Sequence, residues 1–575
     1  MIRMFERHKI RQVAELDGIW NFEPTQGPAG SLPRQYRARM MVPGVWESHP
    51  DYRNYRGRAF FERTLHRDAD GPLRLVFKGV SHTATVHLDG KRIGHHYNAF
   101  TPFTIEIPKV RAGTHSLVVE VDNSFGAHSA LHKPNDYYTY GGLTRPVAVE
   151  TIPSAFIERI LATPQRHGRG WKLKVRVRLR NIGRQSFAGR VAVEAAGKNV
   201  SQSVRLTPRK SAEISCELRV ANSAAWTPES PALHSLTATL FTDDGTPCDD
   251  LIERVGLREI KVHGRKILLN NREIKLRGFN RHEDAADFGC AVPVQIMQQD
   301  LDLMADMNAN FVRTAHYPND ERFLDLCDER GFLVWEENHA RALMADTMKL
   351  KAFPKQIADC DREMVLNHFN HPAIVLWGVF NECESFTALG RRHYEASVKR
   401  IRELDPSRPL TAASCYPHKD ITLDLFDIIA FNRYIGWYRG DLDAIRPELD
   451  KLLQWIRKDG NGNKPFIMSE FGAGAIPGWR AARRSKWTEE YQADLLDASL
   501  DVYLRHPRVN GVAVWQFCDV RITEEGGWFA RRPRTMNNKG VVDEYRRPKL
   551  AFDIVKRRFG GEKKTVRPRQ SPVSQ

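Results

Sequence analysis

Two glutamates, Glu382 and Glu470, each close a short apolar run of the chain. The run "VLWGVFNE" ends at Glu382, and "PFIMSEFG" carries Glu470. Such runs are typical of buried β-strands, so each carboxyl group is expected where a dry interior opens to a pocket. Two carboxyl groups facing each other could hydrolyse a glycosidic bond, one as acid and the other as nucleophile or base. The alternative is a pair of structural carboxylates held by Arg313 and other cations.

The elements that must position these glutamates are strands alternating with helices. From about residue 260, strand-like runs are separated by helical patterns such as "VQIMQQDLDLMADM". The runs are "IKLRGFN", "NFVRTAHY", "FLVWEENH", "AIVLWGVFNE", "LTAASCY", "DIIAFNRY", "PFIMSEFG" and "GVAVWQFCD". This number of runs predicts a TIM (β/α)8 barrel over residues 259–560. The connection between the fifth and sixth runs is too short to require a full helix.

The barrel would bring Glu382 and Glu470 to one rim, because the carboxyl ends of its strands meet there. Most of the runs end in polar side chains, as expected for an active-site rim. A carboxyl separation of about 5 to 5.5 Å would give retention at the anomeric carbon, and about 6.5 to 9.5 Å would give inversion. The sequence alone does not fix that distance.

The first 260 residues show a different sequence pattern. Short β-type runs such as "LRLVFKGV" and "WKLKVRVRLRN" follow one another between turn residues, which predicts antiparallel sandwiches. A break near "TIPSAF" divides them into domains at residues 1–152 and 153–258. The fold class is therefore multidomain, all-β followed by α/β.

Composition excludes several classes of protein. The chain has 575 residues with 41% hydrophobic and 27% charged residues, and no apolar run long enough for a membrane span. The net charge of +17 is spread over the chain, with no nucleic-acid motif. Its one dense basic cluster predicts a disordered tail at 561–575, with a polyanion contact as the alternative. The eight cysteines form no CxxC pair, and the N-terminus does not look like a signal peptide, so we expect a cytoplasmic protein.

The chain resembles glycoside hydrolase family two, the β-glucuronidase and β-galactosidase family, along almost all of its length. The motifs that carry the resemblance are "LDGIWNF", "VPGVW", "VHLDGKRIGHHYNAFTPF", "NDYYTYGGLTRPV", "RGFNRHED", "FVRTAHYP", "VFNE", "FNRYIGWY" and "SEFG". The resemblance implies a jelly-roll-like sandwich, an immunoglobulin-like sandwich and a barrel. It also implies retention, with Glu382 as acid/base and Glu470 as nucleophile. We expect a homo-oligomer that needs no cofactor and no metal.

The resemblance extends to single residues. Asn381 matches the amide that holds the substrate 2-hydroxyl, and Tyr434 the tyrosine beside the nucleophile. Arg313 is expected to help keep Glu470 ionised, since a nearby cation lowers a carboxyl pKa. The remaining assignments are hydroxyl contacts by His282 and by Asp136 of the first sandwich, an apolar wall from Trp515, substrate contacts by Asn432, Tyr438 and Arg534, and a supporting role for His316. An insertion around 522–536 leaves open whether Arg532 or Arg534 points inward.

The stretch "TMNNKG" indicates which substrate the protein binds. Asn537 and Lys539 match the asparagine-x-lysine pair by which β-glucuronidases of the family recognise a uronic acid. A sugar carboxylate entering a dry pocket needs a cation and hydrogen-bond donors to offset its desolvation. We therefore predict small-molecule or oligosaccharide β-uronides as substrates. β-Glucuronides come first, then β-galacturonides, with β-galactosides a distant third. A polar surface turn is the alternative.

Two other classes of function fit less well. A metal-dependent barrel hydrolase could use His282, His316 and His339, but the first strand leads into "RHED" and not the usual HxH. A non-catalytic sugar-binding protein would be expected to lose one of the two glutamates, and both are present.

Overall fold

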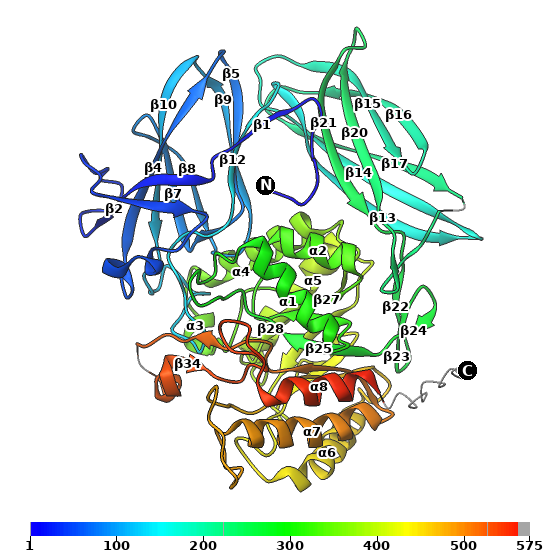
Figure 1. Ribbon diagram of the computed structural model, residues 1–575. Coiled ribbons are helices and arrows are strands. Elements are labelled where there is room, and N and C mark those ends of the chain that lie inside the picture. Colours follow the sequence, from blue (N-terminus) through cyan, green and yellow to red (C-terminus); the bar gives the residue numbers. More distant parts are fainter. Residues whose placement is uncertain (1, 222, 526, 562–575) are drawn as a thin grey trace, which may run out of the picture.

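The structure, a computed structural model, describes residues 2–221, 223–525 and 527–561. Figure 1 shows two β-sandwiches lying side by side above a barrel, with the N-terminal segment running between them. The predicted tail at 561–575 lies outside the described residues except for Gly561.

The first sandwich packs a four-stranded sheet against a six-stranded sheet around an apolar core. Both sheets are antiparallel. The four-stranded sheet runs β1 (Gln12–Glu15), β12 (Val147–Thr151), β5 (Gly71–Phe77) and β9 (Phe103–Val110). The six-stranded sheet runs β3 (Ala38–Val42), β2 (Gly18–Thr25), β4 (Arg58–Arg67), β10 (Gly113–Asp122), β7 (Thr83–Leu88) and β8 (Lys91–Tyr97).

The second sandwich packs three strands against four around its own core. Its strand β14 shows the alternation that builds such a layer: in "GWKLKVRVRLRN" every second side chain is buried. The two sheets are β13 (Ala155–His167), β14 (Gly170–Asn181) and β17 (Ser211–Val220), and β16 (Lys198–Leu206), β15 (Phe187–Ala195), β20 (His234–Thr242) and β21 (Pro247–Val255). The short strands β22 (Ile260–His263), β23 (Lys266–Leu269) and β24 (Arg272–Glu273) lead to the barrel.

The barrel closes through parallel pairing of β25 with β32. Its strands are β25 (Leu276–Asn280), β26 (Phe311–Thr314), β27 (Leu333–Glu337), β28 (Ile374–Asn381), β29 (Leu410–Ser414), β30 (Ile429–Asn432), β31 (Phe466–Phe471) and β32 (Val509–Val514). All eight predicted runs overlap a barrel strand, which confirms the predicted barrel. Every residue of β28 is buried, because helices cover the outside and side chains fill the inside.

Helices surround the barrel at most crossovers. They are α1 (Val294–Asp306), α2 (Glu321–Arg330), α3 (Ala345–Met348), α4 (Phe353–His368), α5 (Ala388–Leu404), α6 (Ile445–Lys458), α7 (Glu489–Arg505) and α8 (Leu550–Gly560). Side-chain caps fix several of their starts; the Thr488 hydroxyl, for example, accepts from the backbone N–H of Tyr491 at the start of α7. Between β29 and β30 the chain forms only the 3-10 turn Leu423–Leu425, as the short connection predicted. No helix within the described residues is long and apolar enough to span a bilayer.

One segment of the first sandwich reaches the barrel. The chain after β10 extends towards α3 and β34 (Met536–Asn537) before it returns to the sandwich (Figure 1). Asp136 in this segment forms an ion pair with Arg532 of the loop after β32. The first sandwich thus supplies a side chain to the rim of the barrel.

Candidate active site

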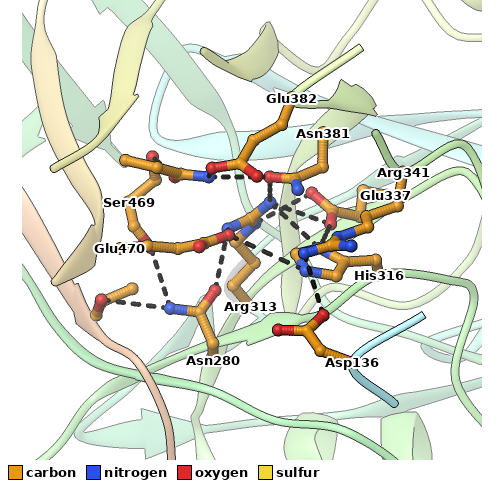
Figure 2. Close-up of polar contacts among 12 residues, drawn as sticks. Asp136, Asn280, Arg313, His316, Glu337, Arg341, Asn381, Glu382, Ser469 and Glu470 are labelled. Carbon is orange, nitrogen blue, oxygen red and sulfur yellow. Dashed lines mark hydrogen bonds and ion pairs between the residues drawn. The ribbon is translucent and has the colours of Figure 1, made fainter. Parts of the chain in front are cut away.

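Glu382 and Glu470 line one cavity of about 590 Å³ at the carboxyl ends of the barrel strands. Figure 2 shows both side chains directed to the same centre, with the Arg313 guanidinium beneath them. The cavity wall also contains the predicted residues Asp136, Asn432, Tyr434, Tyr438, Trp515 and Lys539. The barrel therefore brings together carboxyl groups that lie far apart in the sequence.

The backbone at Glu382 explains why β28 ends there. Phe380 and Glu382 have φ values of 49° and 51°, in the left-handed region that residues other than glycine rarely adopt. The pairing of β28 with β29 also shifts register between Gly378 and Asn381. Such irregularities re-aim side chains at functional sites. The Glu382 carboxyl Oε1 then accepts a hydrogen bond from Asn432 Nδ2 at 2.9 Å.

Glu470 is held by two donors. Arg313 Nη1 donates to its Oε1 at 2.8 Å, and the Tyr434 hydroxyl donates to its Oε2 at 2.7 Å. Burial raises the pKa of Glu470 to about 8, and Glu382 adds to this, while Arg313 and Tyr434 act in the opposite direction. Arg313 thus favours the ionised form, as predicted from the sequence, but does not cancel the effect of burial.

Arg313 is the centre of a buried network (Figure 2). It donates to both carboxyl oxygens of Glu337 at 2.9 and 3.0 Å and to Asn381 Oδ1 at 2.8 Å. His316 Nδ1 lies 2.8 Å from Glu337 Oε1. Asn280 Oδ1 accepts from Arg313 at 2.9 Å. We assigned no role to Glu337 or Asn280 from the sequence, although both lie at strand ends.

Asn381 and His282, two of the predicted substrate contacts, each have one side-chain nitrogen without a hydrogen-bond partner among the described residues. Asn381 Oδ1 accepts from Asn432 Nδ2 at 3.0 Å, but Asn381 Nδ2 is buried and bonds to none of the described residues. His282 Nδ1 contacts the Tyr317 hydroxyl at 3.2 Å, and His282 Nε2 likewise has no partner in the described chain. Neither Asn381 nor His282 is among the residues that line the cavity wall. Asn381 directly precedes Glu382 and is bonded to Asn432, both of which line the wall, so its Nδ2 is the candidate donor to a ligand hydroxyl.

Lys539 is a basic residue of the cavity wall. Lys539 is 1% exposed, and its Nζ donates to the Tyr438 hydroxyl at 3.0 Å; no carboxylate of the described residues forms an ion pair with it. Burial lowers the pKa of Lys539 well below its ordinary value, and Arg532 adds to this. A buried cation without a carboxylate partner is costly unless a ligand supplies the anion.

Asp136 lies between two guanidinium groups. Arg341 Nη2 and Arg532 Nη2 contact its carboxyl oxygens at 2.9 and 2.8 Å. Although burial disfavours its charge, these two arginines bring the pKa of Asp136 below its ordinary value. The predicted hydroxyl acceptor is therefore already engaged by arginines in the free protein.

The structure corrects the assignment of Arg534 and changes the role expected of Asn537. Arg534 was predicted to face the substrate, but it pairs with Glu544 and its side chain is 40% exposed. Arg532 lines the cavity in its place, because the insertion turns at Arg534, where φ is 62°. Asn537 is fully buried, and its Nδ2 lies 3.3 Å from the Asp136 carboxylate, outside the cavity wall. Asn537 thus positions Asp136.

Arg341 was missed by the sequence analysis, although a signal existed. It lies four residues after β27 and lines the cavity together with Tyr416 and Trp528. Residues just after a barrel strand are candidates for the rim, and the same argument identified Glu382. Trp515, which was predicted, lies 2% exposed and stacks on His316 with 4.9 Å between the ring centroids.

One cluster among the described residues has the composition of a metal site, but it lies elsewhere. Asp325, Asp328 and His371 place ligand atoms within 4.8 Å of one another. Their atoms are already bonded: Asp325 accepts from Arg3, and Asp328 accepts from the Ala373 backbone N–H. The cluster thus fastens the N-terminal segment to the barrel.

Comparison with known proteins identifies the family. The family model "Glycosyl hydrolases family 2, TIM barrel domain" matches residues 260–563. The models "Glycosyl hydrolases family 2" and "Glycosyl hydrolase 2 galactose-binding domain-like" match 155–258 and 51–157. A β-glucuronidase of Streptococcus agalactiae is 28% identical over 96% of both chains.

Solved structures are similar over nearly the whole chain. A β-galacturonidase from Eisenbergiella tayi bound to galacturonate is 46% identical, with a TM-score of 0.93, covering 97% of this chain and 99% of that one. A β-glucuronidase from Ruminococcus gnavus is 26% identical, with a TM-score of 0.85, covering 97% and 98%. The chain is a glycoside hydrolase, and it belongs to glycosyl hydrolase family 2.

Proposed function

We propose that the protein removes terminal β-D-uronic acid residues from glycosides, with β-galacturonides preferred over β-glucuronides. The observation that carries the uronide assignment is Lys539, a buried cation facing the cavity with no carboxylate partner among the described residues. The cavity wall contains five basic side chains, Arg341, Arg433, Arg439, Arg532 and Lys539, against the three carboxyl groups of Asp136, Glu382 and Glu470. A sugar carboxylate would balance this excess.

The choice between the two uronides rests on a different observation. The β-galacturonidase is 46% identical to this chain, and the curated β-glucuronidase of Streptococcus agalactiae is 28% identical. This reverses the order that we predicted from the asparagine-x-lysine pair alone. β-Glucuronide hydrolysis remains the second candidate, because Asn537 and Lys539 are both present.

The proposed reaction has two displacement steps. Glu470, ionised, attacks the anomeric carbon, while Glu382 gives its proton to the departing glycosidic oxygen. Glu382 then takes a proton from water, and the water oxygen replaces Glu470 at the anomeric carbon, so configuration is retained. The donors Arg313 and Tyr434 on the carboxyl group of Glu470 support this assignment. Asn381 Nδ2 would donate to the sugar 2-hydroxyl.

The test is a comparison of kcat/KM on aryl β-D-galacturonide, β-D-glucuronide, β-D-galactoside and β-D-glucoside with the purified protein. We expect both uronides to be cleaved, the galacturonide faster. A protein that prefers either neutral sugar would overturn the uronide proposal. Faster cleavage of the glucuronide would restore our original order.

A further inference from the structure

A second cavity lies where the three domains meet, away from the active site. It encloses about 620 Å³ and is lined by β5 and β9 of the first sandwich, β13 and β14 of the second and α4 of the barrel. It shares no lining residue with the active-site cavity. Its wall therefore combines side chains of both sandwiches and of the barrel.

The acidic side chains of this wall already have basic partners. The pairs are Glu253 with Arg7 at 2.7 Å, Glu321 with Lys78 at 2.5 Å, Glu158 with Arg178 at 3.0 Å, Glu106 with Arg180 at 2.6 Å and Glu363 with His96 at 3.1 Å. Arg362 of the wall pairs with Asp359 at 3.2 Å. Of the two remaining arginines, Arg159 has no carboxylate partner among the described residues, and Arg74 shares Glu150 with Arg11.

Arg159 is the first of these. The pairing of β13 with β14 shifts register between Ile157 and Arg159, so the consecutive residues Glu158 and Arg159 both line the cavity. Arg159 donates one hydrogen bond, to Asn367 Oδ1 at 3.2 Å, and forms no ion pair with any described residue. Burial lowers the pKa of Arg159 to about 10, and the neighbouring Arg74 contributes.

Arg74 is the second. It is 5% exposed, and its Nε lies 2.9 Å from Glu150, a carboxylate that Arg11 also contacts at 2.8 Å. Its terminal nitrogens donate no hydrogen bond within the described part of the chain. A buried guanidinium with unused N–H groups normally has an acceptor.

We propose that this cavity is a binding site for a tetrahedral oxyanion, a phosphate or sulfate group, held between Arg159 and Arg74. Guanidinium groups present paired N–H donors that match two oxygens of such an anion. The cavity is larger than one free ion, so the anion could also be carried on a sugar. The site is independent of the proposed glycosidase activity.

The experiment titrates the full chain with inorganic phosphate, inorganic sulfate and glucose 6-phosphate by calorimetry, at constant ionic strength. We expect one saturable site per chain and a rise in Tm that saturates with it, because the ligand binds only the folded state. Equal affinity for phosphate and glucose 6-phosphate would indicate the free ion, and tighter binding of the sugar phosphate would indicate a sugar-borne group.

Three variants make the test specific. Arg159→Gln should weaken binding at least about tenfold, which is the effect of losing one hydrogen bond to a charged group. Arg159→Lys keeps the positive charge but loses the paired N–H donors of the guanidinium, so its affinity should lie between those of wild type and Arg159→Gln. Arg176→Gln removes a charge on the neighbouring strand, outside the cavity wall, and should bind like wild type. Absence of a saturable site in wild type, or equal binding by Arg159→Gln, would overturn the proposal. Unchanged kcat/KM on an aryl glycoside shows that the variants are folded.

Discussion

Replacing Lys539 by alanine should selectively impair hydrolysis of uronides. Removing one partner of a buried charge pair costs about 2 to 5 kcal/mol. Here burial lowers the pKa of Lys539, so part of the favourable free energy of its interaction with a sugar carboxylate offsets the cost of keeping the buried ammonium charged. We therefore expect the lower part of that range, about 2 to 3 kcal/mol, or a loss of about 30- to 150-fold in kcat/KM.

The assay compares aryl β-galacturonide with aryl β-galactoside, which differ at the sugar carboxylate. Lys539→Ala should lose activity on the first and change little on the second. Arg534→Ala is the matched control, because Arg534 pairs with Glu544 outside the cavity and should leave both rates unchanged. Equal losses on both substrates for Lys539→Ala would refute the argument, since the lysine would then not distinguish a carboxylate.

Further predictions concern the carboxyl groups, pH and metal. Glu470→Gln should abolish turnover, whereas Glu382→Ala should retain activity on an aryl glycoside whose leaving group needs no proton; steady-state rates on activated and unactivated glycosides decide this. Tyr434→Phe removes a donor that favours the ionised form of Glu470, so the pKa of Glu470 should rise and the acid limb of the kcat/KM profile should move to higher pH; an unmoved limb would contradict this. Because the pKa of Lys539 is lowered, KM for the uronide should rise with increasing pH well before the ordinary lysine pKa is reached, while KM for the galactoside stays flat; parallel profiles would count against it. Chelator treatment should leave activity intact, and a loss restored by a divalent ion would contradict the metal-free mechanism.

The strand ends of the barrel could be predicted because their signal is local. Apolar runs that end in Glu382 and Glu470 carry both the strand and the position on the rim in a few residues. The barrel then fixes which ends meet, without any knowledge of side-chain contacts. The same reasoning could have included Arg341 and Glu337, which also follow or close a strand.

The loops could not be predicted in the same way. Arg532 and Arg534 are two residues apart in one insertion, and which one faces the cavity depends on a local turn in which Arg534 and Thr535 both have positive φ. The engagement of Asp136 by two arginines depends on a segment of the first sandwich meeting two barrel loops. Such long-range contacts leave no periodic pattern in the sequence. The Arg159 cavity arises from the packing of three domains and was likewise not predicted.

The configuration of the first product tests the central claim most directly. Proton NMR during cleavage of an aryl β-D-galacturonide would identify the anomer that forms before mutarotation. With Glu470 as nucleophile and Glu382 as acid/base, the β-anomer of galacturonic acid should appear first. Initial appearance of the α-anomer, or no cleavage of the uronide at all, would contradict the account.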